Sequence, residues 1–129
     1  MENKINIESN VEDRKRIYII DHSDAKKLND LKGEILDVKE YIFKSYYKEP
    51  EYNEDGTLKE DGYQKIITLL VDTDDQVYVT ASKIFANDLK ELLQYFENDE
   101  TLKDGFKIKI IEKSMTKSKN KALSFQLEM

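Results

Sequence analysis

Aromatic and lysine side chains recur along several predicted strands at positions that face away from the predicted core. Rings of this kind can stack on nucleic-acid bases, while neighbouring lysines follow the phosphates, and the combination holds single strands without sequence preference. We therefore treat the set as a candidate binding face for single-stranded nucleic acid. Its members are Lys39, Tyr41, Phe43, Tyr46, Tyr47, Lys65, Tyr78, Lys107, Lys109 and Lys113.

The alternative for each ring is ordinary packing between neighbouring strands, which is the more frequent role of any single exposed aromatic residue. A ring on the solvent side of a strand lowers solubility unless it is covered or used. The prediction thus rests on the set as a whole.

Residues that could carry catalysis or hold a metal are sparse. The chain has no cysteine, and its one histidine, His22, has no second imidazole or thiol beside it in the pattern, so we expect a surface or capping role. Asp72, Asp74 and Asp75 suit a hairpin turn better than a cation site. Residues 53–56 lack the further ligands of a calcium loop. We therefore predict no enzyme activity, no metal and no cofactor.

Charge is distributed unevenly along the chain. The formal net charge is −6, but residues 103–121 hold seven lysines against two acids, which leaves +5 there and −11 on the remainder. An anionic ligand would be steered to such a basic surface. The alternative is a solvated, lysine-rich strand end.

The elements that would position these residues follow from hydrophobic periodicity. Alternating residues predict strands, and apolar residues at helical spacing after Ser82 predict an amphipathic helix. The predicted elements are a flexible segment 1–16, a strand 17–20, a short helix 21–31, a long strand 34–43, a loop 48–63, a hairpin of 64–71 and 76–82, a helix 83–96, and a hairpin of 106–111 and 123–127.

This order predicts a mainly β protein with one helix: an OB-fold-like five-stranded barrel whose helix lies between strands 3 and 4. In the long strand we expect Leu36, Val38 and Ile42 to face the core, and Tyr41 and Phe43 to face away from it. Residues 17–129 would form one domain behind the flexible segment 1–16. A small open α+β sheet is the competing topology.

No apolar run approaches the roughly 20 residues that a membrane-spanning helix needs, and the first residues lack the pattern of a signal peptide. We therefore expect a cytoplasmic protein with no membrane partner.

Part of the chain resembles a known family. The run Lys-Ile-Ile-Thr at 65–68, the acidic hairpin, Val77-Tyr78, Ser82 and the helix ending at 91–96 resemble the single-stranded-DNA-binding replication proteins of small, protein-primed tailed phages of Gram-positive bacteria, and residues 31–35 look similar. The resemblance covers somewhat over half of the chain. It implies an OB-like fold, coating of displaced strands during replication, no catalysis, and a role for Tyr78. The acidic loop 48–63 and the lysine-rich residues 113–121 depart from the family pattern.

The resulting hypothesis is a non-specific single-stranded DNA-binding protein, with RNA as another ligand of the same chemistry and replication proteins as further partners. Its location would be the host cytoplasm if a phage encodes it. The alternative is an acidic interaction module or inhibitor that binds a host protein. That module would use Glu49, Glu51, Glu54, Asp55, Glu60 and Asp61. A carboxylate-based hydrolase ranks last.

Overall fold

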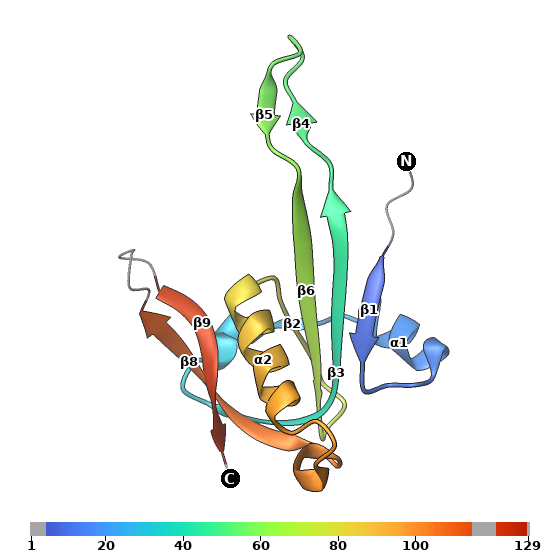
Figure 1. The fold of residues 1–129 in the computed structure, drawn as a ribbon, viewed down its shortest axis with the longest axis vertical. Coiled ribbons are helices and arrows are strands. Elements are labelled where there is room, and N and C mark those ends of the chain that lie inside the picture. The colour runs from blue at the N-terminus through green and yellow to red at the C-terminus, as the bar shows by residue number, and fades with distance from the viewer. Residues whose placement is uncertain (1–4, 115–120, 129) are drawn as a thin grey trace.

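A computed structural model describes residues 5–114 and 121–128, which form a mainly β protein with a curled, half-barrel sheet and two α-helices (Figure 1). The elements are β1 (Asn6–Ser9), α1 (Arg14–Asp21), β2 (Lys26–Lys27), the 3-10 helix η1 (Leu28–Leu31), β3 (Ile35–Lys48), β4 (Glu51–Tyr52), β5 (Leu58–Glu60), β6 (Tyr63–Asp72), β7 (Val77–Thr80), α2 (Lys83–Tyr95), the 3-10 helix η2 (Glu100–Leu102), β8 (Phe106–Ser114) and β9 (Lys121–Glu128). Neither α-helix in these described ranges is long and apolar enough to cross a membrane.

The main sheet is organised around β3. Its strand order is β2-β7-β6-β3-β8-β9, and β1 adds to β3. Residues 38–48 of β3 pair with β6, whereas residues 35–38 pair with β8, so one long strand belongs to both halves of the curl. Among the described residues no pairing joins β9 to β7, which leaves the sheet open. The barrel-like β fold is confirmed, but the described strands exceed the five predicted, and α2 lies between the seventh and eighth of them.

A β-bulge decides which side chains of β3 are buried. The pairing of β3 with β6 shifts register between Val38 and Glu40. An extra residue at a bulge reverses the alternation that follows it. Tyr41 and Phe43 therefore face the same core as Val38, while Ile42 faces the opposite side of the sheet. The prediction that Tyr41 and Phe43 point away from the core is wrong for this reason.

The sheet has a core on each face. The larger core lies inside the curl under α2 and contains Leu28, Leu36, Val38, Phe43, Leu70, Phe85, Ala86, Leu89, Phe106, Ile108, Ile110 and Leu123. The second core lies between α1 and the outer face of β3, β6 and β7, and contains Ile20, Ile42, Leu69, Val71 and Val77. The small helix α1 thus covers part of the outer face.

Helix α2 and the β6–β7 turn match their predictions. The Ser82 hydroxyl accepts a hydrogen bond from the Phe85 amide at 3.1 Å, which caps the helix at the residue the sequence indicated. In the turn between β6 and β7, the Asp72 carboxylate accepts hydrogen bonds from the amides of Asp74 and Gln76, both at 2.9 Å. The three acids here therefore belong to a hairpin turn.

The N-terminal part differs most from its prediction. Residues 17–20, predicted as a strand, lie in α1, whose N-terminus is capped by the Asp13 side chain. Ile17 and Ile20 are three residues apart, so both reach the second core from one helix face. Within 21–31, predicted as one helix, Asp21 ends α1 and residues 26–31 form β2 and the 3-10 helix η1. Residues 6–9, assigned to the flexible segment 1–16, pair with β3.

The predicted loop 48–63 is a two-stranded arm. Strands β4 and β5 pair and extend the β3–β6 ribbon well beyond the rest of the sheet (Figure 1). At its base, a Cβ on Gly62 would lie 2.0 Å from the Tyr47 hydroxyl, so only glycine fits there without displacing that ring. Acids, Asp-Gly pairs and a proline favour a loop locally, but the β3–β6 pairing continues to Lys48 and Tyr63 and holds the two arm strands together.

Candidate functional site

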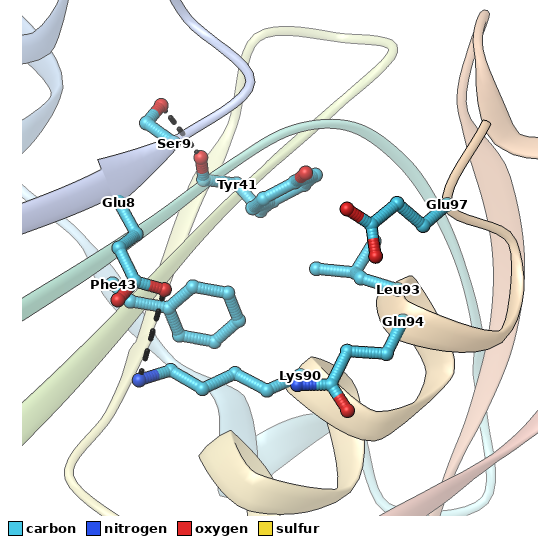
Figure 2. A pocket seen from close by; sticks show the side chains of 8 residues that line it. All are labelled: Glu8, Ser9, Tyr41, Phe43, Lys90, Leu93, Gln94 and Glu97. Carbon is cyan, nitrogen blue, oxygen red and sulfur yellow. Dashed lines mark hydrogen bonds and ion pairs between the residues drawn. The ribbon is translucent and has the colours of Figure 1, made fainter.

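The predicted binding residues do not form one surface. Tyr41 and Phe43 line a groove of about 370 Å³ between β1, β3 and α2, shown in Figure 2. Phe43 is only 3% exposed, and the Lys90 ammonium lies 5.2 Å from its ring centroid. That ammonium also lies 3.9 Å from the Glu8 carboxylate. Phe43 is therefore too buried to stack on a base.

Tyr41 shares this groove with acidic neighbours. Burial raises the pKa of its hydroxyl, and the charge of Glu8 raises it further. Among the described residues that line the groove, there are two acids, Glu8 and Glu97, and one cation, Lys90. A phosphate would meet more negative than positive charge at this point.

Lys39 is engaged in an ion-pair network. Its ammonium contacts the Asp75 carboxylate in the β6–β7 turn, and Arg16 lies 3.4 Å from the same carboxylate and 2.7 Å from that of Glu40. The hydrogen bond from Lys39 lowers the pKa of Asp75, and the charge of Arg16 adds to this. The network ties α1 to the sheet.

Tyr78 packs partly against the larger core. Burial raises the pKa of its hydroxyl, and the nearby carboxylates of Asp72, Glu34 and Asp74 raise it further. Lys26 is its partner in the short parallel pairing of β2 with β7. The ring therefore lies on the inner side of the sheet in an acidic setting.

The lysines of β8 form a separate region. Lys107 lies between Asp37 and Glu128 on the neighbouring strands, and the Lys113 ammonium lies 3.9 Å from the Asp88 carboxylate. Lys109 is partly buried, beside Ile35 and Gln126. Acids thus offset much of the predicted basic stretch. Its members Lys117 and Lys119 lie outside the described residues.

Two predicted residues do meet, on the outer face of the sheet beyond α1. Tyr46 of β3 is the direct cross-strand partner of Lys65 of β6, and Lys48 is that of Tyr63. Directly opposite side chains in an antiparallel pair lie about 5 Å apart. Tyr47 is 44% exposed, but alternation places it on the opposite face.

The Tyr63 ring gathers cations from two elements. The Lys48 ammonium lies 5.6 Å from its centroid, and the Lys83 ammonium, from the start of α2, lies 5.8 Å from it. Both distances fall within the range of cation–π attraction. We call Lys27, Tyr46, Lys48, Tyr63, Lys65 and Lys83 the lysine–tyrosine face.

A hollow of about 360 Å³ adjoins this face. Ile67, Val79 and Ala81 line its apolar part, and Lys27 and Lys65 line its charged part. Asn29 and Thr80 complete the lining. The hollow can accept a flat or apolar group while its lysines hold an adjacent anion.

The lysines of this face differ in whether a carboxylate already pairs with them. Lys48 lies 3.5 Å from Glu51 and 3.9 Å from Glu60, and its pKa is raised, mainly by Glu60. In the part of the chain that the structure describes, no carboxylate lies within 4 Å of the ammonium groups of Lys27, Lys65 or Lys83. Those three can pair with an external anion.

Sequence reasoning missed Tyr63, Lys27, Lys48 and Lys83. Residues 63, 65 and 67 lie on one side of β6, so extending the alternation back by one residue would have found Tyr63. Lys27 and Lys83 come from β2 and α2, and no local pattern links them to β6.

Other kinds of site find little support in the described ranges. Among residues 5–114 and 121–128, no three His, Cys, Asp or Glu side chains come together in a way that could hold a metal ion. No protein-family model matches this chain, and neither a curated protein nor a solved structure matches it.

Proposed function

We propose that this protein binds single-stranded DNA without sequence preference through the lysine–tyrosine face, and that it catalyses no reaction. The observation that carries the proposal is the meeting of two tyrosines and four lysines on a part of the sheet that neither helix of the described ranges covers. Stacking on rings and pairing with phosphates are the two contacts that non-specific strand binding needs.

The arrangement suits a flexible strand. Tyr46 and Tyr63 lie at neighbouring cross-strand pairs, so their rings can contact successive bases. Lys65 and Lys83 then lie within reach of the phosphates between those bases. The hollow beside Lys65 accepts a further base against Ile67 and Val79. A stiff duplex cannot turn its bases toward the rings, so single strands are preferred.

The strand order supports an OB-like assignment. One long strand, β3, is shared by two halves of the curl, and a hairpin, a helix and a second hairpin follow it. OB domains bind strands on the face of their second and third strands, which correspond to β6 and β7 here. The lysine–tyrosine face lies on that side. The role we propose is the one implied by the resemblance to phage replication proteins: coverage of displaced strands.

The test is a titration with oligo-dT and with duplex DNA of equal length at two salt concentrations. The chain has eight tyrosines and no tryptophan, so quenching of tyrosine fluorescence reports stacking directly. We expect tighter binding of oligo-dT and a steep loss of affinity with salt. An affinity for oligo-dT that does not change with salt, or an absence of binding at low salt, would contradict the proposal. Oligo-U in parallel measures the preference for DNA over RNA.

A further inference from the structure

The β4–β5 arm is a preorganised hairpin. At its tip the Asp55 carboxylate accepts hydrogen bonds from the amide and hydroxyl of Thr57, at 3.0 and 2.6 Å, and Gly56 adopts a positive φ of 87°. At its base Lys48 lies between Glu51 and Glu60. An arm ordered in this way loses less conformational entropy on binding than a disordered loop.

The arm presents an apolar pair among carboxylates. Tyr52 and Leu58 are cross-strand partners, and they are 62% and 52% exposed. Residues 49–61 hold six acids against Lys59, a local charge of −5. Nothing among the described residues covers the two apolar side chains. An exposed apolar pair with a charged rim is typical of a surface that binds another protein.

The hollow on the sheet has the complementary chemistry. It offers apolar side chains from Ile67, Val79 and Ala81 beside the ammonium groups of Lys27 and Lys65. An apolar tip bordered by carboxylates fits an apolar hollow bordered by lysines in both respects.

A molecule's own arm points away from its own hollow. The arm continues the β3–β6 ribbon outward (Figure 1), and Tyr52 is six residues beyond Tyr46, about 20 Å at the usual rise of a strand. A second copy carries the same hollow and has no such restriction. The sequence alone suggested a host protein as the partner of these acids, whereas this chain itself supplies a surface of complementary charge.

We propose that the arm of one copy docks in the hollow of a second copy. Tyr52 and Leu58 contact the apolar lining, and the arm carboxylates pair with Lys27 and Lys65. The contact shares its hollow with the proposed DNA site, so arm and strand compete. In that respect the proposal deepens the proposed function, but self-association itself requires no DNA.

The experiment is sedimentation velocity of the full chain without DNA over a wide range of concentrations. We expect the average mass to rise with concentration at about 0.05 M salt and to fall back to the monomer at about 0.5 M, because salt screens the ion pairs. A first variant reverses three arm charges, Glu49→Lys with Glu54→Lys and Asp61→Lys, which changes the charge of residues 49–61 from −5 to +1 and spares the acids that pair with Lys48. A second reverses the hollow, Lys27→Glu with Lys65→Glu.

Each reversed variant alone should stay monomeric, because arm and hollow then carry like charge. An equimolar mixture of the two should associate again, since the basic arm of one meets the acidic hollow of the other. Glu91→Lys with Glu97→Lys and Glu100→Lys, on α2 and just after it, is the matched control and should associate as the wild type does. Tyr52→Ser with Leu58→Ser should also abolish association.

A wild-type protein that stays monomeric at low salt overturns the proposal, as does association that survives reversal of the arm charges. Circular dichroism of each variant establishes that it is folded. Added oligo-dT should release the associated copies. If the copies associate but oligo-dT does not bind, the proposed function fails and this inference stands. If oligo-dT binds a protein that stays monomeric, this inference fails and the proposed function stands.

Discussion

The outer face of the β3–β6–β7 sheet has two halves with opposite surfaces. In one half Ile42, Leu69 and Val71 are buried beneath Ile20 of α1. In the other half the same strands carry Tyr46 and Lys65, and neither α1 nor α2, the two α-helices in the part of the chain that the structure describes, lies over them. Strands that continue without interruption thus change from aliphatic to aromatic and basic residues where α1 ends.

Ion pairs hold α1 at that boundary. Asp21, its last residue, lies 2.8 Å from the Lys44 ammonium, and Arg16 pairs with Glu40 at 2.7 Å. The helix has only eight residues, so it covers only part of the face. Apolar burial by α1 therefore stabilises one half of the outer face, whereas the half that carries Tyr46 and Lys65 lies beyond the end of this helix.

The largest effect expected concerns the covered half. Ile20→Ala removes a side chain that is 1% exposed, and it should lower the free energy of unfolding by about 2–5 kcal/mol in urea titrations. Ile19→Ala is the matched control, because Ile19 is 59% exposed on the same helix and should change stability by no more than about 0.5 kcal/mol. Equal losses for the two variants would show that α1 does not cover the face as described.

The next effect concerns the rings of the open half. Tyr46→Ala should weaken oligo-dT binding by about 1–3 kcal/mol, the usual contribution of one stacked base. Tyr95→Ala should leave affinity unchanged, because Tyr95 is 78% exposed but lies on α2. Tyr41→Ala should lower stability instead, since its ring packs against the larger core. Fluorescence titration and thermal unfolding of the three variants separate these outcomes.

A single lysine contact should have a smaller and salt-dependent effect. Lys65→Ala should reduce the slope of log affinity against log salt by about one, as expected for the loss of one phosphate contact. Lys107→Ala is the control from β8, where Asp37 and Glu128 flank the lysine. If Lys107→Ala lowers this slope and Lys65→Ala leaves it unchanged, the phosphate contacts lie on β8 and not on the lysine–tyrosine face.

The smallest effect concerns the ion pairs at the edge of the covered half. Lys39 and Arg16 lower the pKa of Asp75 below its ordinary value of 3.8. The stability that these pairs contribute is therefore present above pH 3.8 and is lost as pH falls through the lowered pKa. Asp75→Asn should lower the urea midpoint slightly at neutral pH, and the difference from the wild type should vanish in acid. A difference that persists in acid, where the carboxyl is protonated, would assign it to a cause other than charge.

Local periodicity predicted the elements whose packing follows the rule for one buried face. The helix predicted at 83–96 appears as α2. The two predicted hairpins appear as β6–β7 and β8–β9, near their predicted positions. The rule failed at residues 17–20, where contact with the sheet decides the conformation. Ile17 to Ile20 looked like a strand because isoleucine favours strands, but these residues bury one helical face against the sheet. Tertiary contact outweighed the local preference.

The candidate site was predicted less well than the fold. Tyr46 and Lys65 belonged to the predicted set and lie together, whereas Phe43 is in the core and Lys39 is paired with an acid. A bulge of one residue moved Phe43 inward, and its position could not be read from an otherwise regular alternation.

The sequence by itself determined the chemical inventory: no cysteine, one histidine, eight tyrosines, and acids concentrated in 49–61. It also determined the turns and the cap whose hydrogen bonds lie within a few residues. Only the tertiary structure decided which rings are exposed and which lysines meet. Burial on β3 depends on its register with β6, and Lys27, Lys65 and Lys83 come from three elements that only the folded sheet brings together. Contacts between distant segments leave no periodic pattern in the chain, so a local pattern cannot predict them.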